Sequence, residues 1–411
     1  MHGSQWNRAP HLLLVALCGC PSPDSAPLGP AESDLDGAPW ARVEAAARGR
    51  TVHWAMWQGD PFINEYVDGW VKPRLKERFD IELQVVSSQG NDIVSRLMTE
   101  LEAGPQQSEY DIMWINGETF YQLRQIDALH GPFTSKLPNA RFVDFENPFI
   151  GIDFQQPIEG MECPWGNVQL ALIYDSALIE DPPRTPEALE AWVRAHPGRF
   201  TFDTDFTGLT FLKSLLIHFA GGPGSLHGPF DPELYAAHGE ELWEYIRRLK
   251  PFLWKEGRTF PSRVSQLHQL FIAGEIDFTM SNNDGEVDNK VLQGLFPDTA
   301  RAYVLETGTV QNTHYIGIAK NTGNLAAALV TINFLISPEA QFQKTLPSVW
   351  GDGTILALRR LPQRWRSKFK DVPQRTHAPS RASIRDQALM EPASEYMIRM
   401  FKDLRTRVIE R

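Results

Sequence analysis

The chain has 411 residues, a formal net charge of −11, and 42% hydrophobic and 22% charged residues. This length is more than one hydrophobic core usually holds, so we expect two lobes. A protein this acidic repels phosphate backbones, which disfavours nucleic acid as a partner.

The first twenty residues have the features of an export signal. Leu12–Cys18 is an apolar run far shorter than the ~20 residues that span a bilayer. The sequence Leu17-Cys18-Gly19-Cys20 resembles the lipobox of bacterial lipoproteins, in which the last cysteine is lipidated. We therefore predict a signal peptide at 1–19 and membrane attachment through a lipid on Cys20. An ordinary secretory signal cleaved near Ala26 is the alternative.

Residues 20–48 are predicted to form the lipidated cysteine and a flexible tether. Residues 21–39 are rich in Pro, Ser, Gly, Ala and Asp, and such a stretch cannot bury enough apolar surface to repay its ordering entropy. Of the three cysteines, Cys163 alone follows the tether, so it can form neither an internal disulfide nor a cysteine-based zinc site. We interpret it as a small buried hydrophobic residue.

Strand and helix signals alternate in the next part of the chain. Strands are predicted at 51–57, 81–88 and 110–116, and helices at 62–79, at 91–104 with Asn91 as its N-cap, and at 118–126. The strand segments are rich in β-branched and aromatic residues, and the helices show apolar residues about four apart. This alternation indicates a mostly parallel sheet with helices on both faces.

A loop-rich stretch, 127–162, separates these elements from a second set. Strands are predicted at 168–174, 276–281, 301–305 and 314–319, and helices at 186–196, 207–220, 238–250, 262–273, 324–336 and from Ser337 onward. A new α/β unit is expected to open within this set, at Thr185-Pro186.

Particular segments of the chain carry a family resemblance. Pro164–Leu178 (PWGNVQLALIYDSAL) looks like a strand that crosses between lobes, and His314–Thr345 looks like the return crossing with its paired helices. Further matching pieces are Trp114–Glu118, Gly131–Asn139, His196–Phe200, Asp205–Phe211 and Val349–Asp352. Together these segments resemble the extracytoplasmic solute-binding proteins of ABC importers, and within them the YnjB-type group.

The resemblance implies an α/β fold of the type II periplasmic-binding-protein kind, with two hinge-linked lobes and a ligand cleft between them. Lobe 1 is expected to comprise 49–163 and 314–349, and lobe 2 to comprise 164–313, with 350–411 packing on lobe 2. It also implies that a monomer, outside the cytoplasm, captures a small solute by hinge closure. The solute then passes to a membrane permease with its ATPase, and no cofactor is expected.

Candidate ligand contacts follow the strand ends, because ligands of open α/β sheets sit beyond the carboxyl ends of the strands. In lobe 1 these candidates are Trp57, Gln58, Ser88, Asn116 and Glu118. Turn formation and helix capping are the alternative roles of the polar residues among them.

The remaining candidates lie at the crossings and in lobe 2. They are Trp165, Asp205, Thr210, Asn282, Asn283, Asp284, Asn312, Trp350 and Asp352. Core packing is an equal alternative for Trp165, and helix capping is an alternative for Asp205.

The candidate set suits an organic cation, of a thiamine- or polyamine-like kind. Its tryptophans can attract a cation by ~0.5–2 kcal/mol each, and its carboxylates add opposite charge. A neutral sugar is the alternative. An anion is disfavoured, because these loops contain no Arg or Lys, and no metal site is expected, because Tyr174 and His314 do not form a ligand cluster.

Enzymatic motifs are missing from the sequence, which contains no G-x-S-x-G, H-E-x-x-H, phosphate loop or G-x-G-x-x-G. We therefore expect a binding protein and not an enzyme. A lipid-anchored hydrolase and a non-transport scaffold lipoprotein on the same fold are the alternatives.

The C-terminal residues 356–411 carry 14 Lys and Arg against 6 Asp and Glu. They could face an acidic partner or lipid headgroups, or form a solvated helical surface.

Overall fold

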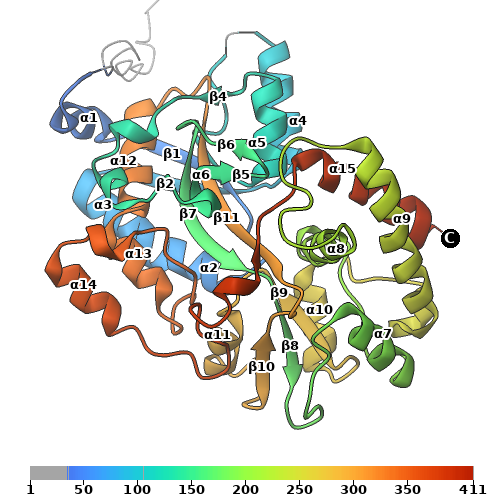
Figure 1. Ribbon diagram of the computed structural model, residues 1–411. Coiled ribbons are helices and arrows are strands. Elements are labelled where there is room, and N and C mark those ends of the chain that lie inside the picture. The colour runs from blue at the N-terminus through green and yellow to red at the C-terminus, as the bar shows by residue number, and fades with distance from the viewer. Residues whose placement is uncertain (1–34, 36, 105, 411) are drawn as a thin grey trace, which may run out of the picture.

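The computed structural model describes residues 35, 37–104 and 106–410. The predicted signal peptide and the predicted lipid on Cys20 lie outside these residues. The prediction of a flexible tether over 20–48 is wrong for its last part, because Trp40–Ala47 form a helix whose Val43 and Ala47 pack in the lobe-1 core. Two α/β lobes are joined by strands that run from one lobe to the other (Figure 1). The expected two-lobe α/β fold is thereby confirmed.

Lobe 1 is organised around a seven-stranded sheet with the order β12-β11-β3-β1-β2, in which β4 and β7 also pair with β11. The strands are β1 (Thr51–Met56), β2 (Glu82–Ser87), β3 (Ile112–Ile115), β4 (Leu129–His130), β7 (Glu162–Gln169), β11 (Thr309–Ala319) and β12 (Ala388–Leu389). The pairs β1–β2 and β1–β3 are parallel. Because side chains alternate along a strand, Val52, Trp54 and Met56 enter one core and Ala55 enters another on the opposite face.

Helices cover both faces of this sheet. They are α1 (Trp40–Ala47), α2 (Pro61–Glu65), α3 (Lys72–Phe79), α4 (Asn91–Glu102), α5 (Gly117–Gln125), α6 (Pro148–Gly151), α12 (Leu325–Leu335) and α13 (Pro338–Thr345). The predicted helix 62–79 is α2 and α3 joined by a π-helical turn. Pro73 lies in the first turn of α3, where the missing N–H of proline is tolerated. The prediction of Asn91 as an N-cap is wrong, since Gly90 precedes the helix and Asn91 begins it.

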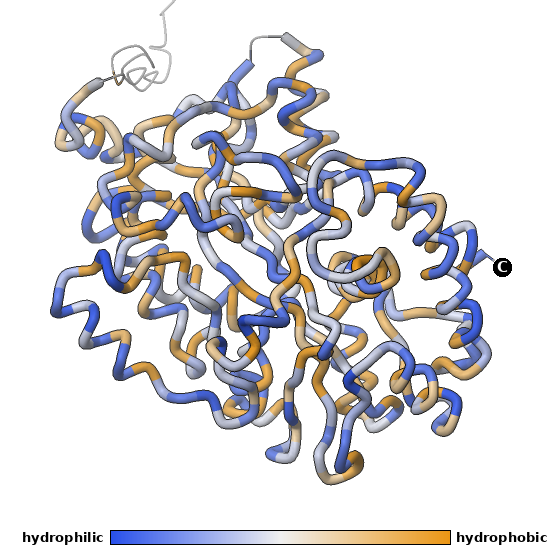
Figure 2. Tube along the Cα trace, viewed as in Figure 1, coloured by the Kyte–Doolittle hydropathy of each residue, from blue (hydrophilic) through white to orange (hydrophobic). Residues whose placement is uncertain are grey.

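Lobe 2 contains a three-stranded antiparallel sheet with the order β10-β8-β9. Its elements are β8 (Ala171–Asp175), β9 (Phe278–Ser281), β10 (Ala300–Tyr303), α7 (Pro186–Ala195), α8 (Phe206–Phe219), α9 (Pro232–Leu249), α10 (Val264–Ile272) and α11 (Glu286–Leu292). Helix α8 lies inside the lobe with Thr207–Ile217 buried, and its apolar residues are orange in Figure 2. A helix that is apolar around most of its circumference is expected at such a central place.

The crossing between the lobes is formed by β7 and β11, which pair antiparallel. β7 leads through Leu170 into β8 of lobe 2, and β11 returns to lobe 1. The register of the pair shifts between His314 and Tyr315. Such an irregularity bends the strands locally, and it lies beside the cleft.

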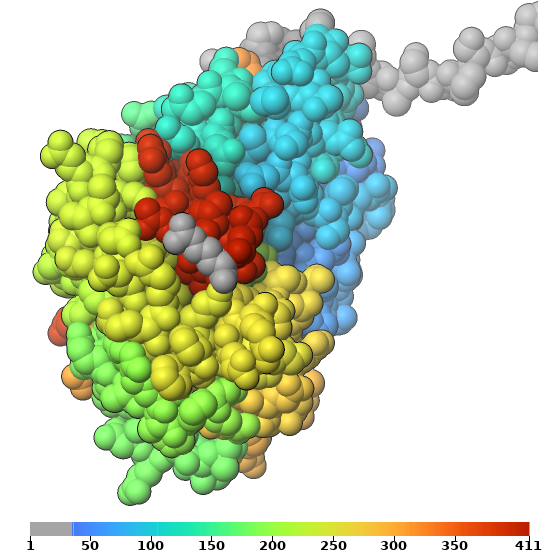
Figure 3. All heavy atoms as spheres, turned by 90° about the vertical axis from the view of Figure 1, so that its right-hand side faces the viewer, coloured from blue at the N-terminus to red at the C-terminus, as the bar shows by residue number. Residues whose placement is uncertain are grey.

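The C-terminal segment contacts both lobes, so the expectation that 350–411 packs on lobe 2 is wrong for its first part. Leu356 and Leu361 pack in the lobe-1 core, and Trp365 of α14 (Gln363–Lys370) packs against it. In contrast, α15 (Ser394–Leu404) enters the lobe-2 core and also contacts α5 of lobe 1. Figure 3 shows these last residues, in red, between the two lobes.

Among the described residues, no single helix has the length and apolar composition needed to cross a membrane. The bent pair α12 and α13 meets that criterion together, and its residues form part of the lobe-1 interior.

Candidate ligand-binding cleft

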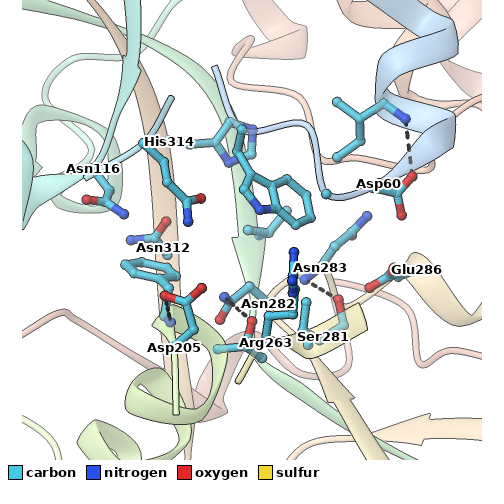
Figure 4. A pocket seen from close by; sticks show the side chains of 18 of the residues that line it. Asp60, Asn116, Asp205, Arg263, Ser281, Asn282, Asn283, Glu286, Asn312 and His314 are labelled. Atoms are coloured by element: carbon cyan, nitrogen blue, oxygen red, sulfur yellow. Dashed lines mark hydrogen bonds between the residues drawn. The ribbon is translucent and has the colours of Figure 1, made fainter. Parts of the chain in front are cut away.

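A cavity lies between the two lobes and encloses about 1260 Å³ of empty space, including its open mouth. Figure 4 shows its lobe-1 residues, such as Asn116 and His314, above and its lobe-2 residues, such as Asp205 and Asn283, below. A cleft of this order of size suits a small-molecule solute.

The lobe-1 wall is formed where β1, β2 and β3 end and where β7 and β11 cross. Its lining residues are Trp57, Gly59, Asp60, Ile63, Gln89, Gly90, Trp114, Ile115, Asn116, Thr119, Val168, Asn312, His314, Trp350 and Asp352. Because β1 is parallel to both β2 and β3, the carboxyl ends of all three strands meet at one edge of the sheet. The loops that follow them therefore converge on the cavity.

Aromatic rings form most of the inner part of this wall. Trp114 meets Trp57 edge-on, with 6.5 Å between ring centroids, and lies 5.0 Å from the His314 ring. His314 is in turn stacked on Trp350 at 5.8 Å. Gly59 leaves room for the outer indole, because a Cβ at that position would lie 2.3 Å from the Trp57 ring.

Behind these rings lies a buried charged group that the protein neutralises itself. Lys344 Nζ lies 2.5 Å from Asp352 Oδ2, and His314 Nε2 lies 3.2 Å from the same oxygen. Burial alone would raise the pKa of Asp352, but the charges of Lys344 and His314 outweigh it and lower the pKa to about 2. Gly166 permits this arrangement, since a Cβ there would lie 2.0 Å from His314 Nε2.

The lobe-2 wall is formed by the amino-terminal ends of α8, α10 and α11 and by the turn after β9. Its lining residues are Asp203, Asp205, Phe206, Thr207, Arg263, Val264, Ser265, His268, Ser281, Asn282, Asn283, Glu286 and Asn289. Helix amino ends offer unpaired N–H groups and partial positive charge, so acidic residues are stabilised there.

Two of these acidic residues have no ammonium or guanidinium partner among the described residues. Asp205 caps α8 by accepting a hydrogen bond from Phe206 N at 2.9 Å, and Asp203 Oδ1 accepts from Asp205 N at 3.0 Å. Burial raises the pKa of Asp203 to about 6, against the opposing N–H groups of Gly208 and Asp205. Burial also raises the pKa of Asp205, and the charge of Arg263 lowers it in part.

An ion pair joins the two lobes beside the cavity. Lys290 of α11 contacts Asp60 of lobe 1 and lies 3.2 Å from Glu286 Oε1. Burial opposes the charge of Lys290, but Glu286 and Asp60 raise its pKa. Burial would likewise raise the pKa of Glu286, while Lys290 and His268 bring it well below its usual value. Lys290 therefore offsets part of the negative charge of these two carboxylates.

Amide side chains supply the uncharged polar groups of the cavity. Asn282 donates to Thr207 Oγ1 at 3.1 Å and Asn283 accepts from Gly285 N at 3.0 Å. Their other polar atoms, Asn282 Oδ1 and Asn283 Nδ2, are buried without a hydrogen-bond partner, as are Asp203 Oδ2 and Asp352 Oδ1. Buried polar atoms are usually hydrogen-bonded, so these four atoms mark places where a ligand could bind.

Eight of the residues predicted from the sequence line this cavity: Trp57, Asn116, Asp205, Asn282, Asn283, Asn312, Trp350 and Asp352. They come from segments up to almost 300 residues apart in the chain, which the two crossing strands bring to one place. Their contact with a ligand stays a prediction.

Six predicted residues do not line the cavity: Gln58, Ser88, Glu118, Trp165, Thr210 and Asp284. Trp165 is fully buried and meets Trp54 edge-on at 5.0 Å, so the core-packing alternative describes its place. Thr210 donates back to Phe206 O within α8. Asp284 accepts from Gln169 N at 3.0 Å and pairs with Arg375 and Arg381.

The other three lie beside the cavity lining. The backbone carbonyl of Gln58 accepts from Asn64 Nδ2 at 3.1 Å, and Ser88 is buried behind the strand end. Glu118 accepts from Gln122 Nε2 at 3.2 Å on α5. Burial raises the pKa of Glu118, with Lys213 lowering it in part.

Several cavity residues were not among the predicted site residues. Trp114 could have been found, because it lies two residues before Asn116 and so shares its face of the chain. Arg263, His268 and Glu286 carry no comparable local signal, since their places depend on how α10 and α11 pack. The candidate loops contain no Arg or Lys, but Arg263 from outside those loops lines the cleft, and Lys290 pairs with Asp60 beside it.

Within the described part of the chain, no group of three or more His, Cys, Asp or Glu residues could hold a metal ion. Tyr174 and His314 in particular belong to different lobes.

Comparison with known proteins gives a family match over the part of the chain that forms the cleft. A family model described as bacterial extracellular solute-binding protein matches residues 70–357. Protein YnjB of Escherichia coli strain K12 is 35% identical over 340 residues, which cover 82% of this chain and 87% of that protein.

Solved structures with similar folds are more distant in sequence. A putative spermidine/putrescine ABC transporter protein from Listeria monocytogenes aligns with a TM-score of 0.59 at 16% identity, over 86% of this chain and 97% of that chain. Iron-bound HitA from Pseudomonas aeruginosa aligns with a TM-score of 0.60 at 14% identity, over 86% and 99%. The agropinic acid complex of AgtB from A. tumefacien R10 aligns with a TM-score of 0.60 at 17% identity, over 88% and 99%. These likenesses concern the fold.

Proposed function

We propose a solute class for this chain from the premise that it belongs to the bacterial extracellular solute-binding protein family and is the solute-binding component of an ABC importer. The proposed solute is a small organic cation. It would lie between the tryptophans of lobe 1 and the acidic end of α8 in lobe 2.

The observation that carries this proposal is the difference among the acidic residues of the cavity. Asp60 and Glu286 share the ammonium of Lys290, and Asp352 has that of Lys344. Asp203 and Asp205 have no such partner among the described residues, although both are largely buried. A buried carboxylate without a cation is costly, and a cationic solute would remove that cost.

The aromatic wall supports the same class of solute. Trp57 and Trp114 are partly exposed and line the cavity. A cation over an indole gains ~0.5–2 kcal/mol, more when it is desolvated. Side chains from both lobes would contact the solute, so it would bind the closed arrangement better and favour hinge closure about β7 and β11.

Arg263 favours a second candidate, a solute that also carries an acidic group. Its side chain is exposed beside the cavity, and no hydrogen bond or ion pair joins it to another described residue. A zwitterion could place its ammonium at Asp205 and its acidic group at Arg263.

We further propose that the protein acts as a monomer, binds its solute without converting it, and is held at the membrane by a lipid on Cys20. A tether ahead of α1 would keep the binding lobes beside the permease and raise their local concentration there. Mass spectrometry of the mature amino terminus tests the lipid: a diacylated Cys20 supports it, and an unmodified terminus near Ala26 contradicts it.

Isothermal titration calorimetry tests the solute class. The purified protein would be titrated with spermidine, putrescine and thiamine, with a zwitterionic amino acid, and with glucose and citrate as neutral and anionic controls. Binding of a cation, accompanied by a higher melting temperature and by no chemical change in the recovered solute, supports the proposal. Binding of the neutral or anionic compounds alone would overturn it, and binding restricted to the zwitterion would favour the second candidate.

A further inference from the structure

A strongly cationic surface lies on lobe 1, away from the cleft. It consists of Arg359, Arg360, Arg364, Arg366, Lys368 and Lys370, and we call it the α14 basic face. These six cations fall within twelve residues that contain no Asp or Glu, in a chain whose net charge is −11. The surface therefore opposes the charge of the molecule as a whole.

The packing of α14 turns these cations outward. Trp365 and Phe369 lie four residues apart and both pack on Phe342 of α13, with ring centroids 6.3 Å and 5.6 Å apart. The helix has no fully buried residue, and its four Arg and Lys side chains are exposed. A helix fixed by one aromatic edge presents the rest of its circumference to its surroundings.

These cations are largely unpaired, unlike those of the neighbouring α3. On α3, Lys72 pairs with Asp68, Lys76 with Asp80, and Arg78 with Glu339. Along α14, by contrast, the described residues provide no ion pair for Arg364, Arg366, Lys368 or Lys370.

The nearest acidic groups do not cancel the charge of the α14 basic face. Arg359 and Arg360 share the single carboxylate of Asp144. Glu339 is already held by Arg78 through two hydrogen bonds of 2.6 and 2.8 Å. Asp371 follows the helix directly, which leaves an excess of positive charge directed outward.

The α14 basic face lies on the side of lobe 1 where the described chain begins. Helix α1 packs on α12, which contacts α13, and α13 carries α14. In Figure 1, α1 and α14 lie on the same flank of lobe 1, at the upper and lower left. A tether attached ahead of α1 would bring this flank toward the membrane to which it is anchored.

We propose that the α14 basic face rests on anionic lipid headgroups and so orients the protein at the membrane surface. Clustered Lys and Arg are attracted to anionic bilayers, and each cation adds to the attraction. A specific protein interface would instead require apolar or aromatic anchors at its centre, whereas both aromatic rings of α14 are directed inward against Phe342. The cations are exposed, and Lys368 Nζ also lies 4.8 Å from the centroid of the Trp365 ring. Exposed cations of this kind suit a fluid plane of headgroups.

Vesicle co-sedimentation tests this proposal independently of the cleft. The full chain carrying Cys20→Ser, to remove any lipid, would be mixed with vesicles of phosphatidylcholine alone or with about a third phosphatidylglycerol. The variant R364Q/R366Q/K368Q/K370Q is compared with K255Q/R258Q/R385Q/K402Q, which removes four exposed cations elsewhere. Melting temperatures and solute binding establish that both variants are folded.

We expect binding to the anionic vesicles alone, weakened by salt, and reduced roughly tenfold or more by the α14 variant but little by the control variant. Equal binding of the two variants, or no binding of the parent chain to anionic vesicles, would overturn the proposal. The protein could instead fail to bind vesicles and yet be retained by the importer in neutral-lipid nanodiscs in a way that depends on α14. That result would assign the surface to an acidic protein partner. Loss of solute binding by cleft variants would leave this result unchanged.

Discussion

The two walls of the cleft treat acidic side chains in different ways. In lobe 1, Asp352 is buried with Lys344 and His314 on one of its oxygens. In lobe 2, Asp203 and Asp205 accept backbone N–H groups and have no cationic side chain on them among the described residues. The difference teaches that one charge stabilises the wall while the other is available to a solute. Proximity to the cavity alone would not have separated these roles.

The largest expected effect concerns the stability of the lobe-1 wall. Lys344→Met leaves the Asp352 carboxylate buried without its ammonium, which costs ~3–5 kcal/mol. Urea unfolding should show this loss. Lys368→Met, which removes an exposed lysine, serves as the matched control and should change stability by less than ~0.5 kcal/mol.

A double variant makes this prediction sharper. Lys344→Met with Asp352→Asn removes both charges, so it should recover much of the stability lost by the single change. If the single variant loses less than ~1 kcal/mol, the ion pair does not support the wall and the comparison fails on its lobe-1 side.

The second effect concerns affinity and belongs to lobe 2. Asp205→Asn removes the charge facing the solute but keeps an N-cap side chain, so a cationic solute should bind roughly 10- to 100-fold more weakly with little change in melting temperature. Asp231→Asn is the control, since Asp231 is also an N-cap, at the start of α9 and outside the cavity lining. Calorimetry measures both variants, and equal affinities would remove Asp205 from the site.

The third effect is a dependence on pH that follows from Asp203. Its folded pKa of about 6 lies above the ordinary value of about 3.9, so its contribution favours folding below pH 4 and is lost as the pH rises through 6. Ionisation over the same range supplies the charge that attracts a cation. Affinity for a cationic solute should therefore rise by up to about tenfold between pH 5 and 7.

Asp203→Asn should remove this rise, because the amide does not titrate. Calorimetric titrations at pH 5, 6 and 7 compare the variant with the parent chain. An affinity that is flat or falls with pH in the parent chain would show that Asp203 does not face the bound charge.

The smallest effect tests the aromatic side of the comparison. Trp57→Leu keeps an apolar side chain but removes the ring, and should weaken a cationic solute by about two- to fivefold, as expected for a partly exposed indole. Trp57→Phe should retain most of the affinity. If the leucine variant binds as tightly as the parent chain, the indole encloses the cavity without attracting the charge.

The fold could be predicted largely from local patterns. Strand β1 and helix α12 lie within a residue or two of their predicted bounds, because apolar periodicity reflects the faces that must be buried. The C-terminal segment could not be predicted in this way. Leu361 and Ile384 enter different cores. A single apolar residue does not indicate in the sequence which lobe will cover it.

Patterns in the sequence predict the alternation of elements, the two lobes and the turns in which a cleft would lie. These depend on interactions between residues close in the chain, which leave periodic patterns. Which polar residues line the cavity, and which are paired with a cation, follows from the packing of the lobes. Asp284 and Asp205 look alike in the sequence, yet Arg375 and Arg381 reach the first and no described cation pairs with the second. That difference depends on residues far away in the chain, because the packing of the lobes determines which of them come close to each carboxylate.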